Sequence, residues 1–149
     1  MADAGSDFAS AALRHIRDAE HLMANEVHVS RDQAWHLAGF AHECARKACI
    51  RDGWVPKLLG HDFSGVSNEV VEFAIALDSR ASRVLVRHWR SRYPAIIAWS
   101  PEHRYERTGT LDKTNNRNLE DLVKQGREAV DACVVAIFLD GSLDMEPIQ

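Results

Sequence analysis

The sequence lacks the features of membrane-spanning and secreted proteins. Among its 149 residues, no run approaches the roughly 18 uninterrupted apolar residues that a membrane-spanning helix needs. The first residues, MADAGSDFAS, are acidic and contain no basic segment followed by an apolar one, so we expect no secretory signal. We therefore expect a cytoplasmic protein that does not bind a membrane.

Cysteine is also scarce. The three cysteines, Cys44, Cys49 and Cys133, are odd in number and lie within apolar helical patterns. No CxxC motif and no paired histidine spacing accompany them, which argues against a zinc site. We expect buried, reduced thiols, and we expect neither a metal nor a cofactor.

Positive charge is concentrated in one part of the chain, although the formal net charge is −4. Between Arg80 and Arg107, seven arginines occur against two acidic residues. From Leu111 to the end of the chain, eight acidic residues outnumber four basic ones. A basic segment inside an acidic protein is typical of proteins that bind nucleic acid or nucleotides.

What the sequence has in plenty is helical periodicity. Apolar residues recur at helical spacing in four segments, at about 7–24, 31–51, 67–90 and 118–139. The second segment starts with a capping-box pattern formed by Ser30 and Gln33. Residues 91–116 contain two prolines and Gly109, so no continuous helix crosses them. We predict one all-α domain, 1–149, an antiparallel four-helix bundle with a long ordered loop between its last two long helices.

The second predicted helix, DQAWHLAGFAHECARKACI, resembles the second helix of small bacterial HEPN domains (higher eukaryotes and prokaryotes nucleotide-binding). Those domains often carry a stretch close to QAxxLAGYAxExxxK. The matching residues here are Gln33, Ala34, Leu37, Ala38, Gly39, Phe40, Ala41, Glu43 and Lys47. Two later segments follow in the family's order, since LLGHDF is similar to its GHDL and WSPEHRYERTG resembles its aromatic and RY segment. The resemblance touches three regions and covers most of the chain.

The resemblance implies a HEPN-like helical bundle that forms a homodimer. Many HEPN members are metal-independent endoribonucleases, often toxins or defence effectors paired with a nucleotidyltransferase-like antitoxin, and others only bind nucleotides or partner proteins. Active members use an arginine and a histidine separated by four to six residues, with copies from two protomers meeting at the interface. Such a pair suits RNA cleavage, because histidine moves a proton near neutral pH and arginine holds the phosphate.

Pairs of arginine and histidine at this spacing occur three times, at Arg14/His21, Arg31/His36 and Arg83/His88. The arginine and histidine content alone supplies such pairs by chance, so the position of each pair along the chain must decide which pair is catalytic. Arg31 is expected to lie in solvent at the start of its helix. We favour Arg83 and His88, inside the arginine-rich segment, as catalytic residues. Positions five apart lie about 140° apart around a helix, so these side chains converge only at a helix end or bend, or across two protomers. Val84 replaces the family's usual polar residue, and the alternative is a surface arginine beside a histidine at a helix–helix edge.

Other candidate binding residues lie close to this pair in the sequence. Arg80, Arg83 and Arg87 are three and four residues apart and therefore line one helix face. They either bind the phosphates of RNA or a nucleotide, or form a solvated face paired with acidic residues of the fourth helix. Those acidic residues are Glu120, Asp121, Glu128 and Asp131. His61 and Asp62 either form a turn before the third helix or place a histidine, oriented by Asp62, at the mouth of the site.

The segment WSPEHRYERTG supplies the last candidates. We expect Trp99 and Tyr105 to anchor it to the bundle and Arg104 to face the substrate, with Tyr105 close to the same site. Tryptophans are expected to pack rather than to stack on bases, and Trp99 is the exception to watch because it shares its loop with Arg104 and Tyr105.

Three functions remain in view. The first is a HEPN-type, metal-independent endoribonuclease, a toxin or defence effector that acts on RNA as a homodimer. The alternative is a non-catalytic HEPN module that binds a nucleotide or a nucleotidyltransferase-like partner protein. The third is a helical interaction protein whose arginines only balance the acidic helix.

Overall fold

The computed structural model describes residues 4–49 and 89–139, and these are mostly helical with no strand among them. Three long helices are α1 (Ala4–Met23), α2 (His28–Ala48) and α7 (Leu119–Leu139). A short helix α6 (Trp89–Arg92) and three 3-10 helices, η1 (Pro94–Ala98), η2 (Pro101–Tyr105) and η3 (Leu111–Lys113), lie between the last two. No helix in these two ranges is long and apolar enough to cross a membrane.

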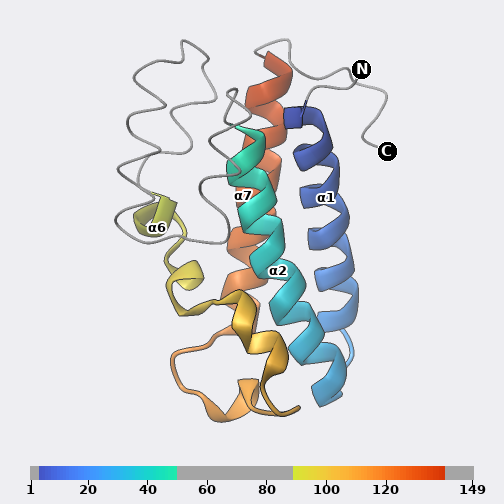
Figure 1. The fold of residues 1–149 in the computed structure, drawn as a ribbon, viewed down its shortest axis with the longest axis vertical. Coiled ribbons are helices and arrows are strands. Elements are labelled where there is room, and N and C mark those ends of the chain that lie inside the picture. Colours follow the sequence, from blue (N-terminus) through green and yellow to red (C-terminus); the bar gives the residue numbers. More distant parts are fainter. Residues whose placement is uncertain (1–3, 50–88, 140–149) are drawn as a thin grey trace.

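The three long helices pack side by side (Figure 1). α1 and α2 form an antiparallel hairpin, and α7 packs against both of them. Half of the buried residues of α2 are alanines, which lets its neighbours approach closely. These alanines are Ala34, Ala38, Ala41, Ala45 and Ala48. Ile16 of α1 and Leu122 and Ile137 of α7 fill the space opposite with larger side chains.

The predicted bounds agree with the structure for the fourth segment, whereas α1 and α2 each begin three residues before their predicted starts. The predicted capping box at Ser30 is wrong, because α2 begins at His28 and its N-cap is Val27, which makes no side-chain cap. The extended backbone of Val27 allows its carbonyl to accept the amide of Arg31 at 3.0 Å, so the helix starts about one turn earlier. The predicted third helix, 67–90, lies outside the described residues except for its last two positions.

Trp99 anchors the connecting segment to α2, as expected. A Cβ atom added at Gly39 would lie 1.8 Å from Cε2 of Trp99, so the indole lies directly on the helix backbone. Phe40 packs edge-on against the same ring, with centroids 5.2 Å apart. Trp99 is 6% exposed and therefore presents no free ring face to a base. The expectation that Tyr105 anchors the loop is wrong, since its side chain is 77% exposed.

Charged contacts fix the rest of the segment between α6 and α7. Arg31 of α2 contacts Asp112 of η3 at 3.3 Å and Glu120 at the start of α7 at 3.0 Å, and His28 contacts Asp112 at 2.8 Å. Arg31 is therefore an interhelical ion-pair residue rather than a solvated one. Within α2, Glu43 and Lys47, four residues apart, form an ion pair at 2.7 Å.

The prediction of buried, reduced thiols is confirmed in part. Cys49 and Cys133 are buried, Cys44 is half-buried, and none of the three forms a disulfide. Burial raises the pKa of the Cys44 thiol to about 11 and holds the pKa of Cys133 well above its usual value, so both thiols stay protonated near neutral pH.

Candidate functional site

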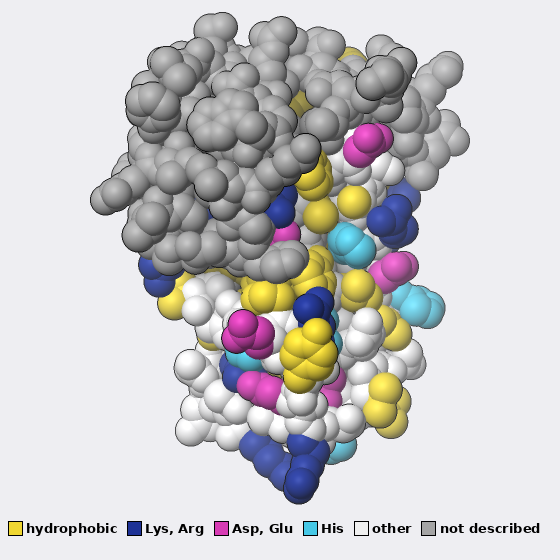
Figure 2. Space-filling model, in the orientation of Figure 1, with side chains coloured by type: hydrophobic (Ala, Val, Ile, Leu, Met, Phe, Trp, Pro, Cys, Tyr) yellow, Lys and Arg dark blue, Asp and Glu magenta, His cyan; other side chains and the backbone are white. Residues whose placement is uncertain are grey.

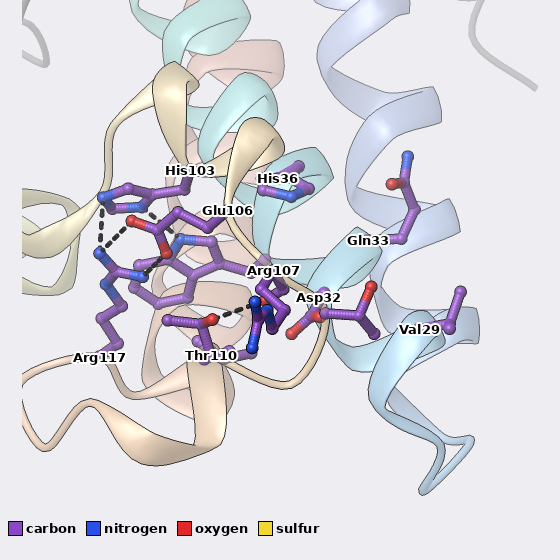
Figure 3. Close-up of a pocket in the computed structure, with 12 residues that line it drawn as sticks. Val29, Asp32, Gln33, His36, His103, Glu106, Arg107, Thr110 and Arg117 are labelled. Atoms are coloured by element: carbon purple, nitrogen blue, oxygen red, sulfur yellow. Dashed lines mark hydrogen bonds and ion pairs between the residues drawn. The ribbon is translucent and has the colours of Figure 1, made fainter.

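A cavity of about 140 Å³ lies between the first turns of α2 and the segment that runs from η2 to α7. Figure 3 shows Asp32 and His36 of α2 on one side of it and His103, Glu106 and Arg117 on the other. The cavity therefore joins side chains that are about 70 to 80 positions apart in the sequence. Every residue that lines it belongs to the described part of the chain.

Local sequence explains how each wall presents its side chains. Asp32 and His36 are four residues apart and share one face of α2. On the opposite wall, Ser100 caps η2 by accepting the amide of Glu102 at 3.3 Å, and Pro101 occupies the first position of the turn. The cap fixes the start of η2, and His103 follows at its third position.

His103 is held by hydrogen-bond donors on both sides of its ring. Trp35 Nε1 donates to His103 Nδ1 at 3.0 Å, and the two rings stack with an interplanar angle of 25°. The Ser100 amide also donates to Nδ1, at 3.4 Å. Because an indole and a backbone amide only donate, we assign Nδ1 as the acceptor and the ring proton of the neutral histidine to Nε2. Nε2 is 3.0 Å from Arg117 Nη2, which is also a donor. Burial and the Arg117 charge lower the pKa of His103, so its imidazole is neutral at neutral pH.

Arg117 is neutralised by Glu106. Its Nη1 and Nη2 contact the two carboxylate oxygens of Glu106 at 2.5 and 3.0 Å, which is the paired geometry of a guanidinium and a carboxylate. The hydrogen bond from Arg117 lowers the pKa of Glu106, so this acid stays ionised. In contrast, Arg107 lines the same cavity and makes no ion pair with any described residue.

His36 and Asp32 form the α2 wall. His36 is half-buried, and its Nδ1 has no hydrogen-bond partner among the described residues. Burial lowers the pKa of His36 in spite of the nearby Asp32 carboxylate, so this imidazole is also neutral at neutral pH. Asp32 Oδ2 accepts the amide of Gly109 at 2.8 Å, and the positive φ of Gly109, +88°, allows the loop to turn toward it.

Two of the predicted site residues are described, and they lie beside the cavity rather than in its wall. The guanidinium of Arg104 lies 4.8 Å from the ring centroid of Tyr105, and the pair is exposed to solvent. On the face drawn in Figure 2, Lys and Arg side chains gather at the lower tip, with acidic and histidine side chains just above them. The remaining predicted residues, Arg80, Arg83, Arg87, His88, His61 and Asp62, lie outside the described residues.

Sequence reasoning missed most of the cavity. His36 was weighed only as the partner of Arg31, and the structure separates them, because Arg31 turns to Asp112 and Glu120. His103 and Arg107 lie within the singled-out segment WSPEHRYERTG, but their pattern carries no helical period that would show which wall they face. No motif or spacing in the sequence singles out Arg117.

Comparison of the chain with models of protein families, with curated proteins and with solved structures gives no match. The HEPN resemblance therefore depends on the residues quoted for it.

Proposed function

We propose that this protein is a metal-independent endoribonuclease that acts on RNA as a homodimer, and that the cavity between α2 and η2 belongs to its substrate site. The observation that supports this function is the grouping of two neutral imidazoles, His36 and His103, with the guanidiniums of Arg107 and Arg117. Proton transfer and phosphate binding are the two tasks that RNA cleavage without a metal requires.

The reaction transfers one proton at each end of the scissile bond. A neutral imidazole takes the proton of a ribose 2′-hydroxyl, and the 2′-oxygen attacks phosphorus. The bond from phosphorus to the 5′-oxygen breaks, and a protonated group donates a proton to that oxygen. The products are a 2′,3′-cyclic phosphate and a 5′-hydroxyl end.

His36 is the described residue that fits the base. Its lowered pKa keeps it neutral at pH 7, and because its Nδ1 is buried without a partner among the described residues, Nε2 is the nitrogen that would meet a substrate. His103 cannot serve in the same way, since its accepting nitrogen is occupied by Trp35. His103 instead offers its Nε2–H as a donor to the phosphate. Arg83 and His88 stay predicted catalytic residues and would supply the acid from the same or the second protomer.

Cleavage of RNA in EDTA tests the proposal. We expect the full chain to cut RNA, and we expect His36→Gln to slow cleavage by about a hundredfold or more, because general acid–base catalysis typically contributes that much. His88→Ala, measured alongside, tests the predicted pair. If both variants cut RNA at the rate of the unmodified chain, neither histidine is catalytic and the proposed site is wrong.

A non-catalytic module that binds a nucleotide or a nucleotidyltransferase-like partner is the second candidate. It is favoured by the environment of the two histidines, because Trp35 occupies the His103 nitrogen that could accept a proton, and His36 Nδ1 is buried. This function predicts intact RNA together with saturable nucleotide binding or a stable complex. It also predicts that Arg104→Ala weakens that binding, since Arg104 is exposed beside the cavity.

A further inference from the structure

We propose that the cavity contains a binding position for a phosphate-type oxyanion, between His103 Nε2–H, the Arg117 guanidinium and Arg107. The inference rests on the proposed function only in taking a nucleotide or RNA as the source of the phosphate. It assigns a ligand to a part of the cavity whose residues the sequence did not single out.

The hydrogen bond from Trp35 carries the first step. Because Trp35 fixes the proton of His103 on Nε2, two donors, His103 Nε2–H and Arg117 Nη2, lie 3.0 Å apart with no acceptor between them. Two donors at this distance repel each other. An oxygen atom that accepts from both removes the repulsion, and an anionic oxygen gains charge-assisted hydrogen bonds as well.

The carboxylates at the cavity do not supply that oxygen. Both oxygens of Glu106 are bound by Arg117, and Asp32 Oδ2 is bound by the Gly109 amide. The remaining Asp32 oxygen is buried without a partner among the described residues and is not exposed to the cavity. The carboxylates of Glu106 and Asp32 are thus bound within the cavity wall, while hydrogen-bond donors remain available to bind a ligand.

Arg107 supplies the charge for an anion. With both imidazoles neutral, the charges of Glu106 and Arg117 cancel, and the Asp32 carboxylate keeps its charge but has Oδ2 on the Gly109 amide and Oδ1 buried. Arg107 is the lining cation that has no carboxylate bound to it among the described residues. A guanidinium placed beside two further donors favours a tetrahedral oxyanion with several acceptor oxygens.

Two sources of the oxyanion share this chemistry. One is a terminal phosphate, as in inorganic phosphate or a nucleoside monophosphate, and the other is the phosphodiester of an RNA backbone. Both present two or more non-bridging oxygens to donors. A cavity of about 140 Å³ is large enough for an ordered group of this kind, since one water occupies about 30 Å³ of liquid.

The test uses the full chain labelled with nitrogen-15 and three probes: inorganic phosphate, AMP and a 2′-O-methyl oligoribonucleotide, which has no 2′-hydroxyl to attack phosphorus. The readout is the indole N–H resonance of Trp35, identified by its loss in Trp35→Phe. We expect at least one probe to shift this resonance with saturation. Arg107→Gln should weaken that binding by about tenfold or more, as removal of a charged donor does.

Lys113→Gln is the matched control. It also removes one positive charge from the segment between α6 and α7, but Lys113 is exposed and does not line the cavity. Equal binding of Arg107→Gln and Lys113→Gln would overturn the inference, as would the absence of any shift with all three probes. Saturation by phosphate and AMP alone assigns the position to terminal phosphates, and saturation by the oligonucleotide assigns it to the RNA backbone.

The inference and the proposed function fail separately. Saturable binding of phosphate without RNA cleavage in EDTA supports the oxyanion position and contradicts the nuclease. RNA cleavage with an unshifted Trp35 resonance contradicts the oxyanion position and leaves the nuclease in place. Arg107 is exposed, so its replacement leaves the core intact, and a far-ultraviolet circular dichroism spectrum checks this.

Discussion

At the scale of single residues, the surroundings of four histidines keep their imidazoles neutral near neutral pH. Burial is the largest cause of the lowered pKa at His15, His36, His42 and His103. His42 is the extreme case, since it is fully buried beside the rings of Trp89 and Tyr93. Its Nε2–H donates to the carbonyl of Leu122 at 3.2 Å, which fixes the tautomer of a neutral ring.

His42 makes stability depend on pH. Burial lowers its pKa from 6.5 to about 4, so the unfolded chain binds more protons between these values and stability falls as the pH falls. The loss from His42 alone is about 2 kcal/mol between pH 7 and pH 5. Urea unfolding at both pH values measures it, and His42→Gln should reduce the pH dependence by that amount. If His42→Gln and the unmodified chain show the same difference in the free energy of unfolding between the two pH values, other residues cause the acid sensitivity.

Replacement of glycine by alanine is expected to change the free energy of unfolding in opposite directions at two positions. Gly39→Ala should lower the free energy of unfolding by about 2 kcal/mol or more, because the new Cβ meets the rigid Trp99 indole at 1.8 Å. In Gly126→Ala the new Cβ meets the flexible end of Ile16, Cδ1, at 2.9 Å and touches the His42 ring at 3.4 Å, and the variant gains up to about 1 kcal/mol of helix propensity. Denaturant unfolding of the two variants compares them, and equal losses would contradict the placement of Trp99 on α2.

At the scale of elements, the candidate cavity is closed by contacts between α2 and the segment that runs from η2 to α7. Trp35 donates to His103 across 68 positions of sequence and sets its tautomer. Helical periodicity predicted α1 and α7 well, because their apolar stripes repeat every turn. The 3-10 turns have no such repeat, and their positions depend on contacts to distant residues, as with the Trp99 ring at Gly39. The start of α2 was misplaced because Val27, three residues before the expected cap at Ser30, already has an extended backbone and accepts the amide of Arg31.

The contact between α2 and η2 predicts a measurable change at His103. In Trp35→Phe, Nδ1 of His103 loses the donor that favours its neutral form, so the pKa of His103 should rise toward its ordinary value. Burial and the Arg117 charge still oppose protonation, and the rise is therefore partial. A nuclear magnetic resonance titration of the histidine rings measures it, with His15 on α1 as an internal reference. A fall in the pKa of His103 would contradict the assigned tautomer.

At the scale of the whole molecule, the sequence predicted the helical class and the segment beside the site but not the residues of the cavity. The arginine-rich segment led to Arg104 and Tyr105, which lie next to the cavity, while His36, Arg107 and Arg117 are brought together only by the fold. The homodimer and the pairing of Arg83 with His88 stay predictions. Sedimentation velocity of the full chain tests the first, and we expect the mass of two chains.

The central claim is that the cavity between α2 and η2 takes part in RNA cleavage. Incubation of the full chain with RNA in EDTA, followed by analysis of the product ends, tests it most directly. We predict 2′,3′-cyclic phosphate and 5′-hydroxyl ends, lost in His36→Gln and Arg107→Gln and retained in Lys113→Gln. Intact RNA, or equal cleavage by all three variants, would contradict the account.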